Sequence, residues 1–270
     1  MNRIFALSWL TFKEGIRDRA LMGICIIALV MLFATIVFTG VFGYDLGKVL
    51  VDLNLSTIAF AGLLLTFFVN INLMAKDIDK RTIYCVLSKP LSRTEYILGK
   101  YLGLILLVCI ALFFLLVFSS GIIAIVKSMY SEIFFKNFSW YCFFQAYFYQ
   151  MLMFFILNAV VIFFSSVSTS SFLVLLFTIA TYITGQTIEE VMVFFKKEAL
   201  GQNTSAVNHW VIDIAQYIFP NFSAFDIKTL ASHGKFLPLE HTTALVGYSL
   251  IYTILLLFFA SMIFNKREIT

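Results

Sequence analysis

Side chains able to ligate a metal ion or to transfer protons gather in one part of this sequence. They are Glu189, Glu190, His209, Asp213, His233 and His241. Imidazole and carboxylate groups serve as metal ligands and as general acids or bases. None of these residues has a ligand spacing such as His-x-x-x-His, and the histidines lie far apart in the sequence. An enzyme with a metal or acid/base site in this region is therefore retained as the alternative interpretation.

Other reactive sites are not indicated. The sequence contains no Gly-x-x-x-x-Gly-Lys-Ser/Thr loop, so the chain does not by itself hold ATP phosphates in that way. The 4 cysteines are scattered, without the close spacing of a zinc or redox motif. No long basic run or RNA-reading motif argues for binding to nucleic acid. We expect neither a metal nor a cofactor on this chain.

The composition is that of a membrane protein. Of its 270 residues, 61% are hydrophobic and only 13% are charged, whereas soluble domains are about half apolar and a quarter charged. The sequence predicts an all-α integral membrane protein that forms a single domain over residues 1–270. Six apolar runs are long enough to be transmembrane helices, and they occupy residues 21–42, 55–75, 101–126, 143–164, 172–194 and 243–264.

The distribution of basic residues predicts the orientation of these helices. Six spans place both termini on the same side of the membrane, together with the segment Lys76–Lys100. These three regions hold 12 of the 19 lysines and arginines, and the links on the other side before residue 195 hold only Lys48, Lys127 and Lys136. Because Lys and Arg are retained on the cytoplasmic side, both termini are expected to be cytoplasmic.

The first 20 residues alternate apolar and charged side chains. Basic residues continue up to the first apolar run and no small-residue cleavage site follows it, so a signal peptide is disfavoured. The pattern favours an amphipathic interfacial helix on the cytoplasmic membrane face. Its aromatic side chains Trp9 and Phe12 are expected in the interface, with Lys13 and Arg17 in water.

The segment Lys76–Lys100 is the one long polar interruption between two apolar runs early in the chain. Helical spacing of its apolar residues predicts a short cytoplasmic helix between spans 2 and 3, over Thr82–Leu87. Pro90 ends that helix, because proline lacks the backbone N–H. Ser92 is placed to cap the next helix, with Glu95 at the capping-box spacing.

The spans themselves carry few polar groups. They are read as free of Asp, Glu, Lys, Arg and His except for Glu189 and Glu190, which disfavours an ion-coupled carrier. Asn70, Asn72 and Asn158 are expected to join helices by hydrogen bonds rather than to bind substrate. Residues 196–242 form an external segment between spans 5 and 6, and apolar residues at helical spacing up to Pro220 predict a helix there.

The segment Lys76–Lys100 resembles the cytoplasmic coupling region of type-2 ABC exporter permeases. The residues that carry the resemblance are Asp77, Asp79, Thr82, Leu87, Pro90, Ser92, Arg93, Leu98, Gly99 and Lys100. Two features depart from the family pattern: Arg81 stands where the family usually has glycine, and aspartate replaces the commoner glutamate at both acidic positions.

The resemblance implies a function. The chain would be the non-catalytic permease subunit of an ABC exporter in the bacterial inner membrane, paired with a second permease chain as a homo- or heterodimer. ATP and Mg²⁺ would be bound by a separate ATP-binding subunit, and the residues implied in contact with it are Asp77, Asp79, Arg81, Thr82, Leu87, Pro90, Arg93 and Glu95. An integral membrane enzyme with an external metal or acid/base site stays as the alternative.

Overall fold

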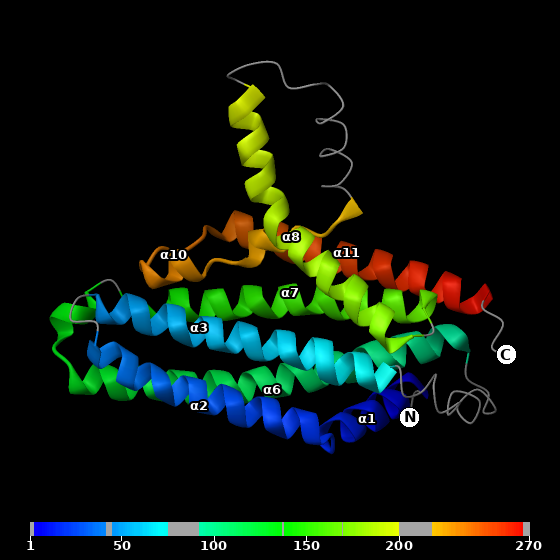
Figure 1. Cartoon of the computed structure of the whole chain (residues 1–270), viewed down its shortest axis with the longest axis horizontal. Coiled ribbons are helices and arrows are strands. Elements are labelled where there is room, and N and C mark those ends of the chain that lie inside the picture. The colour runs from blue at the N-terminus through cyan, green and yellow to red at the C-terminus, as the bar shows by residue number, and fades with distance from the viewer. Residues whose placement is uncertain are drawn as a thin grey trace.

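The computed structural model describes residues 3–41, 45–74, 92–136, 138–168, 170–199 and 218–266. Throughout these ranges the regular structure is helical, as the sequence predicts, and no strand occurs. Figure 1 shows the helices as a bundle. Their bounds are α1 Arg3–Ile16, α2 Arg19–Val41, α3 Leu46–Leu64, η1 Leu65–Asn70, α6 Arg93–Met129, η2 Glu132–Phe135, α7 Trp140–Val167, α8 Ser171–Ala199, η3 Ser223–Phe225, α10 Lys228–Ser232 and α11 Leu239–Lys266.

Six helical stretches of the described chain are long and apolar enough to cross a membrane, which confirms the predicted number. They are α2, the continuous run Leu46–Met74 that contains α3 and η1, α6, α7, α8 and α11. Each begins before the apolar run from which it was predicted, and α6, α7, α8 and α11 also end after it, because the helix continues into more polar residues.

The second span departs most from its expected bounds. It was expected to begin at residue 55, but the helix begins at Leu46 and includes Lys48 and Asp52. The link between the first two spans is correspondingly short, and Asp45 precedes α3 in the left-handed region with φ of 57°. A charge pattern alone could not show this, because lysine and aspartate near a span's end can reach out of the hydrocarbon while remaining helical.

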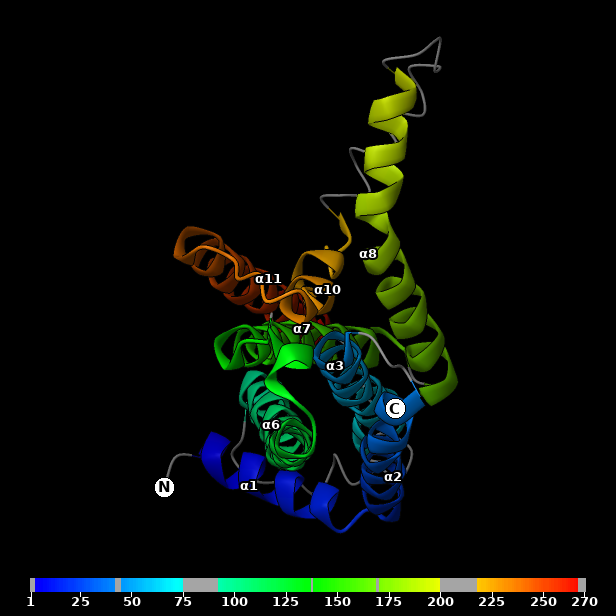
Figure 2. The same ribbon diagram turned by 90° about the vertical axis from the view of Figure 1, so that its left-hand side faces the viewer.

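The bundle has a buried centre and an exposed periphery. Helix α7 and the run Leu46–Met74 are mostly buried, whereas most of the surface of α2, α8 and α11 is exposed. Figure 2 looks along the bundle and shows α7 between α11 on one side and α3 and α6 on the other. Exposed apolar side chains on peripheral helices are the surface that a lipid environment accepts.

Helix α8 is inclined steeply to the rest of the bundle, and its second half rises away from it (Figure 1). After residue 217 the described chain returns to α8, where the N–H of Phe222 donates to the carbonyl oxygen of Gly185 at 2.9 Å. A Cβ atom at Gly185 would collide with the carbonyl oxygen of Pro220. Glycine is therefore what allows the external segment to lie directly on α8.

Buried amides join the central helices. The side chain of Asn70, at the end of the π-helical turn η1, donates to the side chain of Asn158 on α7. The sequence predicts a helix-joining role for Asn70, Asn72 and Asn158, and this contact bears it out for Asn70 and Asn158. Asn72 is exposed and forms no such contact within the described residues. A second contact of this kind was not anticipated: Asn54 on α3 accepts a hydrogen bond of 2.9 Å from Ser119 on α6.

Candidate functional site

The start of α6 is a rigid helix end. The Ser92 hydroxyl accepts a hydrogen bond from the N–H of Glu95 at 3.2 Å, and the Glu95 carboxylate accepts one from the N–H of Ser92 at 2.8 Å. Two backbone donors that a helix N-terminus leaves without partners are thereby satisfied. The capping box expected from the sequence is present, and it fixes where the segment Lys76–Lys100 becomes membrane helix.

The first turn of α6 is also joined to the last turn of α11. Arg93 donates through Nη1 to the carbonyl oxygens of Phe264 and Asn265, at 3.0 and 2.9 Å. Beside it the rings of Tyr96 and Phe264 stack with centroids 5.6 Å apart and an interplanar angle of 14°. A displacement of this end of α6 therefore acts directly on the end of the last span.

Helix α1 packs against the same part of α6. Figure 2 shows it lying across the bundle rather than along it. The Ser8 hydroxyl donates to the carbonyl oxygen of Gly99 at 3.0 Å. One turn further along α6, a Cβ atom at Gly103 would lie 2.7 Å from the carbonyl oxygen of Ser8. The Gly99-x-x-x-Gly103 spacing, which is visible in the sequence, thus permits a close helix crossing.

The four residues predicted for the interfacial helix divide between two environments. Trp9, Lys13 and Arg17 are exposed, as an interfacial position would require. Phe12 is only 6% exposed, because α1 turns it toward the core of the protein. Helix α1 is apolar on two sides, and periodicity alone does not distinguish the side that packs on α6 from the side that faces outward.

Most of the predicted coupling residues lie outside the described ranges. These are Asp77, Asp79, Arg81, Thr82, Leu87 and Pro90. The structure does place the residues on both sides of their segment: Met74 is the last described residue of the second span, and Arg93 begins α6. Of the eight residues, Arg93 and Glu95 are placed, in the contacts given above.

The candidate acid/base and metal-ligating residues do not come together in the described part of the chain. Glu189 accepts a hydrogen bond of 2.6 Å from Ser223, His233 follows α10, and His241 lies exposed in the first turn of α11. Residues His209 and Asp213, with the predicted external helix up to residue 217, lie outside the described ranges. Among the residues that were placed, no three His, Cys, Asp or Glu side chains form a group able to hold a metal ion.

The fold and this site define a class: a multi-pass helical membrane protein whose N-terminal helix packs across the third span, close to where that span is joined to the last one. The comparison with known families is more specific. A sequence model of the ABC-2 family transporter proteins matches residues 5–269, and the chain belongs to that family. It is therefore a membrane transport protein of the ABC permease type. No curated protein matches the chain.

Proposed function

We propose that this chain is the transmembrane permease subunit of an ATP-driven exporter, coupling ATP hydrolysis by a separate ATP-binding subunit to substrate movement across the membrane. Family membership supports the ABC class. The observation that carries the coupling role is the junction at the start of α6, where Arg93 binds the end of α11 and Gly99 contacts α1. An ATP-binding subunit that contacts the segment Lys76–Lys100 can therefore act on α1, α6 and α11 together.

In the proposed mechanism, a movement of the ATP-binding subunit displaces the segment Lys76–Lys100, and this displacement is passed on to the spans. In this proposal the ATP-binding subunit is contacted by Asp77, Asp79, Arg81, Thr82, Leu87 and Pro90. The short helix predicted over Thr82–Leu87 moves with it as a rigid body. Because the capping box holds Ser92 and Glu95 together, the displacement passes to α6 without fraying its first turn. From α6 it passes to α11 through Arg93, which changes the packing of the spans.

The distribution of lysines and arginines supports an orientation of the bundle in the membrane. The α1 end of the bundle, where α1 packs and α11 ends, faces the cytoplasm, since the N-terminus, the segment Lys76–Lys100 and the C-terminal tail hold most of the lysines and arginines. The membrane is the bacterial inner membrane, with α1 in its cytoplasmic interface. A second permease chain, identical or related, completes the transporter, and ATP with Mg²⁺ is bound by the partner subunits and not by this chain.

The decisive experiment is affinity purification in mild detergent after co-expression with the neighbouring reading frames. We expect an ATP-hydrolysing chain to co-purify, and deletion of residues 82–93 to release it. A stable protein that brings no ATPase with it, or a deletion variant that retains the ATPase fully, would contradict the proposal.

Point variants then test coupling separately from assembly. Arg93→Gln and Glu95→Gln should leave membrane insertion and ATPase retention intact while lowering substrate-stimulated ATP hydrolysis. Lys235→Gln is the matched control, because Lys235 is an exposed charge that follows α10 at the other end of the bundle. If the first two variants turn over at the rate of the control, these residues have no coupling role.

A further inference from the structure

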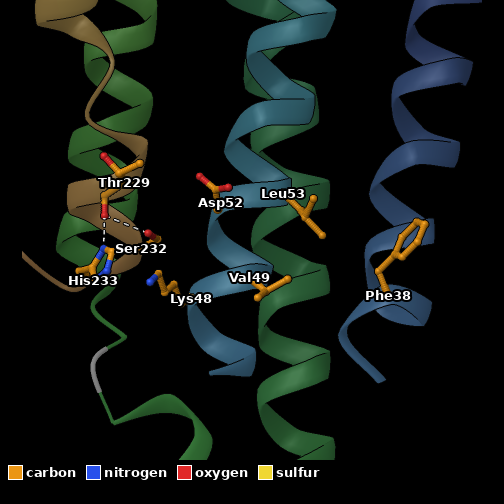
Figure 3. Close-up of a pocket in the computed structure, with 8 residues that line it drawn as sticks. All are labelled: Phe38, Lys48, Val49, Asp52, Leu53, Thr229, Ser232 and His233. Carbon is orange, nitrogen blue, oxygen red and sulfur yellow. Dashed lines mark hydrogen bonds between the residues drawn. The ribbon is translucent and has the colours of Figure 1, made fainter. Parts of the chain in front are cut away.

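A hollow of about 520 Å³ opens between α2, α3 and α10 at the end of the bundle away from α1. Figure 3 shows its walls: Phe38 from α2, Val49 and Leu53 from α3, and Thr229 and His233 from α10 and the residue after it. Its size is within the range of small-molecule sites, which are about 300–1,000 Å³. Its lining surface is mostly apolar, so it suits part of an apolar molecule.

Two opposite charges lie at the edge of this hollow. Lys48 and Asp52 are four residues apart on α3 and therefore lie on one face of the helix. Both point toward α10 in Figure 3. Such a pair commonly forms a salt bridge, yet the ion pairs and side-chain hydrogen bonds of the described residues include neither of them. Both charges are thus available to a ligand.

The α10 side adds polar groups that are already oriented. His233 donates through Nδ1 to the carbonyl oxygen of Thr229 at 2.6 Å, which leaves its Nε2 atom for another partner. The Ser232 hydroxyl donates to the same carbonyl at 2.9 Å. A second hollow of about 90 Å³ shares Lys48, Ser232 and His233, and is also lined by Asp45 and Lys136. Among the residues that line the larger hollow, Lys48 is the lysine, and Ser232 and His233 add polar groups beside it.

The position of the site matches a lipid headgroup. Lys48 lies in the first turn of α3 and Asp52 one turn further, so the two differ in depth by about 6 Å at 1.5 Å per residue. Phe38 is 55% exposed near the end of α2, a helix long and apolar enough to span a membrane. An apolar wall, a cationic group and an anionic group at this depth together match a molecule with an acyl chain, a phosphate and an ammonium group.

We propose that this hollow binds a zwitterionic phospholipid bearing a primary ammonium group, taken from the leaflet at the α10 end of the bundle. The phosphate contacts Lys48, the ammonium group contacts Asp52, and the start of an acyl chain lies along Phe38 and Leu53. A phosphate alone would leave Asp52 as an uncompensated like charge, and a metal ion would meet Lys48. The inference does not depend on the proposed ATP-driven transport.

Native mass spectrometry of the detergent-purified full chain, titrated with dioleoyl phosphatidylethanolamine, tests this. We expect at least one tightly retained lipid, with Lys48→Gln and Asp52→Asn each weakening its binding about tenfold, equivalent to about 1.4 kcal/mol. Lys235→Gln and Glu240→Gln are matched controls, since both residues are exposed charges near the same end that do not line the hollow. They should retain the lipid as the unaltered chain does.

The ligand is varied as well, so that the test does not depend on the variants folding. Dioleoyl phosphatidylglycerol lacks the ammonium group and should bind about tenfold more weakly, and glycerophosphoethanolamine lacks the acyl chains and should not displace the lipid. Equal retention of the two lipids, or normal retention by Asp52→Asn, would overturn the zwitterionic assignment. Displacement by glycerophosphoethanolamine would overturn the role of the apolar wall.

Discussion

Arg93, the first residue of α6, donates a hydrogen bond of 3.0 Å to the carbonyl oxygen of Phe264 in the last turn of α11. The last carbonyls of a helix have no partner within it, and the helix dipole places partial negative charge there. The Arg93 guanidinium supplies a hydrogen-bond donor for these carbonyls and a positive charge beside the negative end of the helix dipole. Arg93 and Phe264 are 171 residues apart in the sequence, and their contact joins α6 to α11 next to the predicted coupling segment.

Arg93→Gln should weaken this junction, because the shorter neutral side chain cannot reach both carbonyls with charge-assisted hydrogen bonds. The site is partly exposed, so the expected loss is about 1 kcal/mol, or a fall in Tm of about 3 °C. Thermal unfolding of the detergent-solubilised chain measures it. Arg19→Gln, an exposed arginine at the start of α2, is the control and should leave Tm unchanged. A Tm for Arg93→Gln equal to that of the control would show that the junction contributes no stability.

Gly103→Ala should displace α1 from α6. The added methyl group would lie 2.7 Å from the backbone oxygen of Ser8, which cannot move without the helix, and such overpacking costs about 1–3 kcal/mol. We expect faster trypsin cleavage at the exposed Arg17. Gly121→Ala is a matched control on the same helix, because its methyl group would meet no atom within 4 Å. Equal cleavage rates in the two variants would mean that the Gly103 contact does not hold α1.

The sequence was sufficient for features that depend on local pattern. The spans followed from uninterrupted apolar length, the cap at Ser92 from its spacing to Glu95, and the helix-joining role of Asn70 from the cost of an amide in hydrocarbon. The partners of these groups were not predictable from the sequence. Nothing local to Arg93 indicates that its guanidinium meets Phe264, since that contact depends on how distant helices pack.

Helix α1 illustrates the same limit. Its amphipathic pattern predicted an interfacial helix, but both Trp9 and Phe12 fit that pattern, and only packing against α6 separates the exposed ring from the buried one. The outer hollow could not be predicted either. By sequence Lys48 and Asp52 precede the apolar run of the second span, and their position at the edge of the hollow depends on α10, which follows them by about 180 residues.

Gly185→Ala should detach the external segment from α8. A methyl group at this position would overlap the backbone oxygen of Pro220 and lie 2.6 Å from the ring of Phe222. The hydrogen bond from the N–H of Phe222 to the Gly185 carbonyl, at 2.9 Å, would lengthen or break. Faster trypsin cleavage at Lys235, followed by mass spectrometry, reports the change.

Gly247→Ala on α11 is the control for that experiment, since its methyl group would enter open space. Unchanged cleavage at Lys235 in Gly185→Ala, relative to this control, would show that the segment is held mainly by its other contacts. One of these is the hydrogen bond of 3.0 Å from the N–H of Asn221 to the Tyr248 hydroxyl.

The contact between Asn70 and Asn158 should contribute a measurable coupling energy. Both side chains are fully buried, and Asn70 is the last residue of the π-helical turn η1, so its amide also fixes an irregular stretch of the second span. Replacing one residue by leucine leaves the other amide without this partner, whereas replacing both removes the polar pair. A double-mutant cycle on Tm or denaturant stability should give a coupling of about 0.6–1.7 kcal/mol, the range for such contacts within membranes.

Asn72→Leu provides the baseline, because Asn72 is exposed two residues away on the same stretch and should show no coupling to Asn158→Leu. Additive effects of the Asn70 and Asn158 substitutions would mean that the amides do not interact energetically, and that η1 is positioned by apolar packing alone. Coupling confined to the Asn70 cycle would identify this amide pair as what holds the second span against α7, directly before the segment that is proposed to contact the ATP-binding subunit.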